Sequence, residues 1–132
     1  NYSKLKNWLK ARDTLAVWAA IAREAKVSES NLNILRFPNI EETVKKAATF
    51  ADWCAQNVDK IDKIHHLDLY GSLLKELPKE IGNLSQLTKL ILNGNQLKRL
   101  PKEIGNLSQL ECLLLTRNEL TKLPKEIGNL SK

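Results

Sequence analysis

The sequence has few of the residues on which several classes of protein depend. It contains no methionine and two cysteines in 132 residues, too few for the disulfide framework of a small secreted domain. No run of about 18 apolar residues occurs, so no transmembrane helix is expected. The opening NYSKLKNW has no apolar signal-peptide core. Because an initiator methionine is missing, we expect a processed N-terminus or a chain cut from a longer protein.

The sequence also lacks a concentrated charge of one sign. The net charge is +6, but residues 1–60 hold 10 Lys/Arg against 7 Asp/Glu, and residues 61–132 hold 11 against 8. The charges often alternate, as in Lys79-Glu80, which is typical of a solvated surface. A nucleic-acid site would need a sharp basic patch. We therefore predict neither a nucleic-acid nor a membrane partner.

What the sequence does contain is an internal repeat of 23 residues. It reads LPKEIGNLSQLTKLILNGNQLKR from Leu77, LPKEIGNLSQLECLLLTRNELTK from Leu100, and LPKEIGNLSK from Leu123. Repeats decide the fold and must be sought first. Each complete copy contains the pattern LxxLxLxxNxL. Its members are Leu87, Leu90, Leu92, Asn95 and Leu97, then Leu110, Leu113, Leu115, Asn118 and Leu120, with a degenerate earlier copy at Ile64, Leu67, Leu69, Ser72 and Leu74.

The spacing of this pattern predicts a stack of parallel strands. Two leucines separated by one residue point to the same face of a strand, which gives three inward pairs. These pairs are Leu67/Leu69, Leu90/Leu92 and Leu113/Leu115. A buried asparagine after each strand can bond the backbone of its own and the adjacent repeat, and Ser72 delays that ladder by one repeat. Pro78 and its equivalents should open a short helical turn, which Gly82 and its equivalents should end.

Residues 1–60 do not follow the repeat, and their apolar residues have the spacing of helices. Leu5, Trp8, Leu15 and Trp18 recur at helical spacing, and Ser3 and Asp13 are plausible N-caps of one bent helix or two abutting helices over about 3–26. A second helix should begin at Asn39 and bury the stripe Ile40, Val44, Ala47, Ala51, Cys54 and Val58. The three tryptophans are most simply core residues; a ligand site is the alternative. We predict that residues 1–60 form a helical N-terminal cap on a repeat region at 61–132.

The unit LPKEIGNLSxLxxLxLxxNxL resembles the 23-residue leucine-rich repeats of bacterial proteins and of plant Ras-group intracellular proteins. That resemblance implies an α/β leucine-rich-repeat solenoid with its parallel sheet on the concave side. A helical hairpin leading into such repeats is similar to leucine-rich-repeat effectors that intracellular bacteria deliver into host cells, which usually bind host proteins. Type III effectors mostly use shorter repeats with a doubled Leu-Pro, and nothing here matches a ligase domain. The implied location is the cytoplasm, or a host cell after secretion.

Candidate chemistry is sparse. Cys112 lies at an outward strand position, but a thiol nucleophile needs a nearby base, and His65 and His66 lie two strands away. His66 and Asp68 share a face, yet two ligands are too few for a metal site. The glutamates after each Leu-Pro keep the 23-residue period and belong to the scaffold. We predict no enzyme activity, no catalytic residue, no cofactor and no metal.

Function is expected at the variable, outward strand positions. These candidate protein-binding residues are His66, Asp68 and Tyr70; Lys89, Ile91 and Asn93; Cys112, Leu114 and Thr116; and Arg117 at the rim. Ile91 and Leu114 are apolar although they face outward, and apolar residues rimmed by polar ones mark interaction sites. Alternatively, they only favour strand formation. We predict a protein-binding module, whose partner would be a host protein if the chain is an effector.

The rival interpretation is a structural or self-associating scaffold. Scaffold leucines at 87 and 110 place the next at position 133, and the sequence ends at Lys132. We expect either further repeats in a longer protein or self-association through an open C-terminal end.

Overall fold

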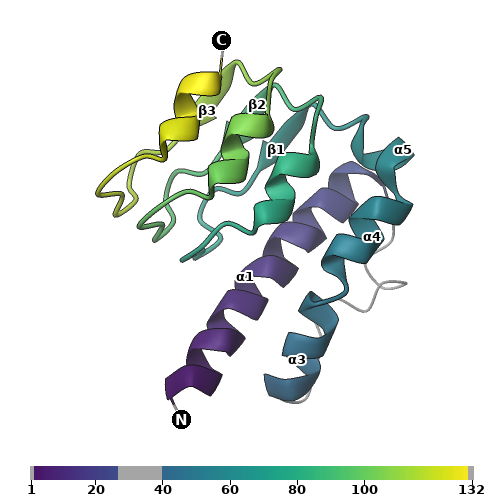
Figure 1. Cartoon of the computed structure of the whole chain (residues 1–132), viewed down its shortest axis with the longest axis vertical. Coiled ribbons are helices and arrows are strands. Elements are labelled where there is room, and N and C mark those ends of the chain that lie inside the picture. The colour runs from purple at the N-terminus through teal and green to yellow at the C-terminus, as the bar shows by residue number, and fades with distance from the viewer. Residues whose placement is uncertain (1, 27–39, 131–132) are drawn as a thin grey trace.

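A computed structural model describes residues 2–26 and 40–130 (Figure 1). The helical part comprises α1 (Tyr2–Glu24), α3 (Ile40–Ala47), α4 (Phe50–Gln56) and α5 (Val58–Ile61). The repeat part alternates strands with 3₁₀ helices: β1 (His66–Asp68), η1 (Lys79–Asn83), β2 (Lys89–Ile91), η2 (Lys102–Asn106), β3 (Cys112–Leu114) and η3 (Lys125–Asn129). The predicted combination of helices with a small parallel sheet is confirmed.

The first helix is continuous, so the two predicted N-caps are wrong. α1 runs from Tyr2 to Glu24 without a break, which places both Ser3 and Asp13 inside it. Asp13 is 2% exposed, and its carboxylate is used in a contact with the repeats that is described below. A capping residue bonds the helix that it starts; this one bonds a different segment.

The second helical segment is divided, and the predicted apolar stripe is confirmed only in part. Breaks follow Ala47 and Gln56, giving three short helices instead of one. Cys54 is buried as predicted, and Val44 and Ala47 are partly buried. Ala51 is exposed and Val58 is 49% exposed, so the prediction is wrong at these two positions. In the helices after the breaks, the buried side chains are Phe50 and Cys54 in α4 and Ile61 in α5. The predicted start at Asn39 lies outside the described residues.

The helices share an aromatic cluster. The Trp18 ring on α1 stacks on Phe50 with centroids 5.1 Å apart and lies 5.7 Å from the Trp53 ring. Trp18 is 1% exposed, and Trp53 is only partly buried. All three tryptophans were predicted to be core residues, but Trp18 alone is fully buried, and Trp8 and Trp53 are partly buried.

The three strands form a parallel sheet in the order β1-β2-β3, in register with the repeat. Leu67 pairs with Leu90, and Leu90 with Leu113. The inward direction of the LxL pairs is confirmed, because Leu67, Leu69, Leu90 and Leu92 are at most 1% exposed. Leu113 and Leu115, in the last repeat, are only partly buried. One continuous core extends from α1 through the repeats.

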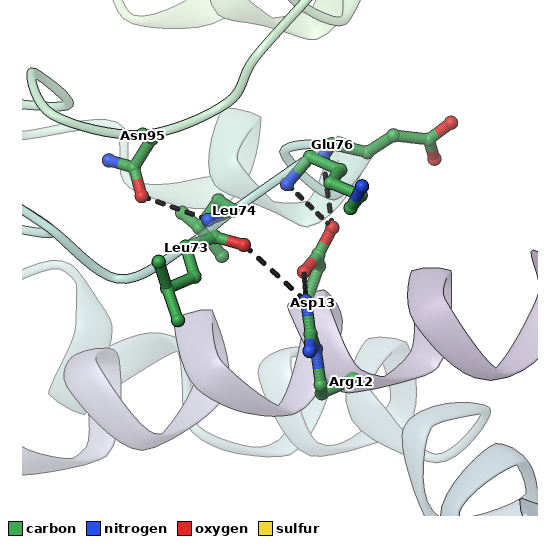
Figure 2. A network of polar contacts seen from close by, with 7 residues as sticks. Arg12, Asp13, Leu73, Leu74, Glu76 and Asn95 are labelled. Carbon is green, nitrogen blue, oxygen red and sulfur yellow. Dashed lines mark hydrogen bonds and ion pairs between the residues drawn. The ribbon is translucent and has the colours of Figure 1, made fainter. Parts of the chain in front are cut away.

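Asparagine amides join each repeat to the one before it. Asn95 Oδ1 accepts from Leu74 N at 2.9 Å (Figure 2). Its Nδ2 donates to the carbonyls of Leu69 and Leu92 at 2.9 and 2.8 Å. Asn118 repeats the arrangement, accepting from Leu97 N at 3.0 Å. The ladder begins at Asn95, as the serine at position 72 predicts. These amides satisfy buried backbone groups that would otherwise cost about 1–3 kcal/mol each.

The proline and glycine positions differ in detail from the prediction. Pro78 is the extended residue before η1, with φ −67° and ψ 151°, and is not its first helical residue. Gly82 lies within η1 and does not end it. A Cβ at Gly82 would lie 2.9 Å from the Glu103 carbonyl oxygen, so this glycine permits adjacent repeats to approach closely.

The helical part contacts the first repeat through a buried carboxylate. α1 contacts β1, and α4 contacts η1. Asp13 Oδ2 accepts from the backbone N–H groups of Lys75 and Glu76 at 3.0 and 2.9 Å (Figure 2). Burial raises the pKa of Asp13 above its usual value, although both N–H groups and Arg12 act in the opposite direction. This carboxylate links α1 to a segment about 60 residues away in the chain.

Candidate functional site

The predicted binding residues do lie on one face of the sheet, which we call the outward face. The strand register aligns His66 with Lys89 and Cys112 in one column, and Asp68 with Ile91 and Leu114 in the next. Tyr70, Asn93 and Thr116 follow at the same repeat position after each strand. The arrangement brings all nine together as three rows of three.

The exposure of these side chains varies across the face. His66, Asp68, Tyr70 and Thr116 are exposed, whereas the row from the middle strand is partly buried: Lys89, Ile91 and Asn93. Cys112 is also partly buried, and Leu114 is 37% exposed. Ile91 and Leu114 are neighbours on paired strands, so they form an apolar centre with polar side chains around it. That geometry suits an apolar contact with an oriented polar rim.

Tyr70 extends the apolar part of the outward face. Its side chain is 57% exposed, and its ring lies over the next repeat, where Cε2 is 3.2 Å from the position of a Cβ on Gly94. Gly94 also has φ +77°, a conformation that a side chain disfavours. The nearby Tyr70 ring and the positive φ both favour glycine at position 94. Asp68 Oδ1 accepts from Tyr70 N at 2.9 Å, which fixes the turn that presents the ring.

Arg117 occupies the rim in a strained conformation. The residues at this repeat position are Gly71, Gly94 and Arg117, and all three have positive φ, at 64°, 77° and 58°. For a residue with a Cβ this region costs about 1–2 kcal/mol. Arg117 is exposed, and its guanidinium adds a bidentate donor to the face where the earlier repeats have none.

The groups considered for catalysis remain apart. Cys112 is two strands from His66 in the aligned column, and His65 Nδ1 lies 3.1 Å from the Gln86 carbonyl oxygen. Cys54 is buried, and burial raises the pKa of its thiol to about 11, which opposes thiolate chemistry. Among residues 2–26 and 40–130, no three His, Cys, Asp or Glu side chains gather as metal ligands.

Two features escaped the sequence interpretation. Asp13 contacts Lys75 and Glu76 across a long sequence separation, and no local pattern predicts that pairing. Lysines recur after the turn of successive repeats, at Lys75 and Lys98. Because these lysines occupy the same position in successive repeats, the sequence alone could have indicated that they form a row on the surface.

In the part of the chain that the structure describes, no helix has the length and apolar character needed to cross a membrane. A comparison with curated proteins gives no match. Solved structures that match include a leucine-rich-repeat protein of Leptospira interrogans, with 30% identity and a TM-score of 0.28. The match covers 58% of this chain and 31% of that one, so the chain spans under a third of that protein. The family described as leucine-rich repeat region matches residues 18–132. With its parallel rungs and asparagine ladder, the chain belongs to the leucine-rich-repeat family.

Proposed function

We propose that the chain is a protein-binding module whose outward sheet face receives the partner. Membership of the leucine-rich-repeat family suggests a protein-interaction role. The observation that carries the choice of surface is the adjacent pair Ile91 and Leu114, aligned on β2 and β3. In this proposal the repeats form a short solenoid with this face as its concave side, and residues 1–60 act as its helical cap.

The apolar centre would supply most of the binding energy. Interface energy is concentrated in a few central residues, each worth about 2 kcal/mol or more when truncated. Ile91, Leu114 and the Tyr70 ring are suited to that role, and His66, Lys89 and Arg117 to orienting contacts at the rim. Thr116 and Asn93 add groups that can both donate and accept hydrogen bonds.

The proposal is tested by replacing the apolar centre with charge. The full chain serves as bait for proteins of its source cell and of a candidate host, and captured partners are then titrated against variants. Ile91→Asp/Leu114→Asp should abolish binding while the chain stays folded. Leu114 is 37% exposed, and an exposed substitution usually costs about 0.5 kcal/mol or less. Ile91 is partly buried, so its substitution should cost more, on the order of 1 kcal/mol. Leu5→Asp/Val58→Asp is the matched control, since these side chains are 48% and 49% exposed elsewhere. Equal binding by both double variants would refute the proposal.

Self-association is the alternative function. The last repeat leaves Leu123 47% exposed, and an apolar surface of this kind can receive a second copy of the chain. Sedimentation or size exclusion over a range of concentrations separates the two functions. A concentration-dependent dimer that Leu123→Asp dissociates, together with no captured partner, would favour the scaffold. An effector secreted into a host cell is a further proposal, which a secretion assay on the full-length protein would test.

A further inference from the structure

A groove lies away from the outward sheet face, between the N-terminal half of α1 and the turns that follow the strands. Two adjoining pockets of about 530 and about 320 Å³ share Lys6, Lys75, Glu76 and Arg99. The N-terminal half of α1 extends past the sheet (Figure 1), so one wall of the groove is helical and the other is built from successive repeats. We call these two pockets together the flank groove.

The flank groove collects basic side chains that are dispersed in the sequence. Among residues 2–26 and 40–130, the cations that line it are Lys6, Lys10, Lys75, Lys98, Arg99 and Lys122. Lys6 and Lys10 belong to α1, and the other four come from the three repeat turns. An even distribution of charge along the chain therefore becomes an uneven one on the surface.

The carboxylates in the flank groove do not cancel this charge. Asp13 is buried and holds two backbone N–H groups, and Glu76 lies 4.0 Å from Arg99. Glu119 is the third acidic residue of the lining. Within the described residues, the five lysines of the groove have no carboxylate within ion-pair distance. Their charges are available to a ligand.

The spacing of the lysines suits a linear anion. Lys6 and Lys10 are one helical turn apart, about 6 Å. Lys75 and Lys98 occupy the same position in adjacent repeats and line the same pocket. An extended peptide places alternate side chains about 6.8 Å apart. Carboxylates on alternate residues of such a peptide can therefore meet successive cations along a wall.

We propose that the flank groove binds an extended acidic segment of a partner protein. The charge of the groove is complementary to such a segment, and its two walls can contact both edges of one peptide strand. Neutral residues of the segment would face Glu76 and Glu119, which a carboxylate would avoid.

A nucleic acid fits these features less well. Among the side chains that the structure describes, none of those lining the flank groove is aromatic, so they offer no platform on which bases can stack. A nucleic acid carries a negative phosphate at every nucleotide, so some phosphates would lie near Glu76 and Glu119 and be repelled by them. Binding of this kind would also be expected to need a larger uninterrupted basic surface.

The test uses a fluorescein-labelled peptide of alternating glutamate and serine, with a glutamine-serine peptide as its neutral control. Fluorescence anisotropy with the full chain should show saturable binding of the acidic peptide that weakens with added salt. Lys6→Glu/Lys98→Glu reverses one charge on each wall, and we expect about tenfold weaker binding or more. Both lysines are exposed, so the fold should be retained, which a melting curve checks.

The matched control is Lys63→Glu/Lys102→Glu, which makes the same change of net charge at exposed positions outside the groove. It should weaken binding by less than about threefold, through long-range screening alone. Ile91→Asp/Leu114→Asp should bind the acidic peptide like wild type, which separates this site from the outward face. Equal losses in both lysine variants, or no saturable binding, would overturn the proposal. Tighter binding of single-stranded oligothymidine, lost in the groove variant, would overturn the choice of an acidic peptide.

Discussion

Two copies of LPKEIGNL, at residues 77–84 and 123–130, lie in different surroundings. In the first, Leu77, Ile81 and Leu84 are 5%, 0% and 1% exposed. In the second, Leu123 is 47% exposed, and Ile127 and Leu130 are only partly buried. The letters are the same, so the difference comes from neighbours: the first copy has packed elements on both sides, and the second on one. Burial in a repeat protein is a property of the stack rather than of the repeat.

The largest expected effect lies on the helical side of the first repeat. Trp18→Ala removes a fully buried ring that stacks on Phe50, and should lower the free energy of unfolding by about 3–5 kcal/mol. Trp53→Ala should cost less, because that ring is partly exposed. Urea denaturation followed by circular dichroism measures both. Equal costs would contradict the expected effect of the difference in burial between Trp18 and Trp53.

The same leucine in two rungs provides the most direct comparison. Leu90→Ala, in the middle strand, should cost about 2–5 kcal/mol, since it leaves a cavity that cannot collapse. Leu113→Ala should cost clearly less, because Leu113 is already partly exposed and water can fill the space. Thermal unfolding of the two variants is sufficient. A larger cost at Leu113 would contradict the described difference between the middle and last repeats.

Equivalent glycines offer a finer comparison. Gly82→Ala would bring a Cβ to 2.9 Å from the Glu103 carbonyl oxygen, whereas a Cβ added at Gly128 would have no other side chain or backbone of the described residues within 4 Å. We expect a loss of about 1–3 kcal/mol at Gly82 from overpacking. Gly128→Ala should be neutral or should stabilise by up to about 1 kcal/mol through the unfolded state. If further chain packs on Gly128 in a longer protein, Gly128→Ala should become harmful there.

The smallest effect concerns pH. Burial raises the pKa of Asp13 in the folded state, so the folded state holds this proton more tightly than the unfolded chain. The contribution of Asp13 to stability is therefore fully present below the unfolded pKa of about 3.9 and is lost as the pH rises through the folded pKa. Asp13→Asn keeps one acceptor oxygen and should remove this dependence.

The check is the difference in unfolding free energy between wild type and Asp13→Asn, measured from pH 3 to 7. Wild type should gain stability relative to the variant as the pH falls. Arg12 and Glu76 are the charged groups that act on Asp13, and they remain in both proteins. The opposite slope would show that the backbone donors outweigh burial.

The repeat part could be predicted from the sequence because its period fixes its geometry. Strand register, the inward LxL pairs and the start of the amide ladder at Asn95 all follow from spacing. The helical part has no such constraint. The breaks before Phe50 and Val58 contain no proline or glycine, so nothing in the sequence marks them. The prediction assumed one unbroken helix and therefore placed Ala51 and Val58 on the buried side, where the structure does not place them.

The candidate sites also include one that could be predicted from the sequence and one that could not. The residues of the outward face were predictable, because alternation along a strand assigns each side chain to one face. The flank groove was not, because it depends on where α1 lies against the turns. The contact of Asp13 could not be predicted for the same reason. Its partners, the backbone N–H groups of Lys75 and Glu76, are distant in sequence.

The amide ladder has a consequence for how the length of this protein can change. Asn95 bonds residues 21 and 26 positions before it, and Asn118 bonds residues 21 and 26 before it. Deleting or duplicating a 23-residue block thus leaves each remaining amide with chemically equivalent partners. Recombination between near-identical copies could shorten or lengthen the chain by whole units while local structure is preserved. Such changes would move the outward face by one row at a time, which offers a simple route to new partners.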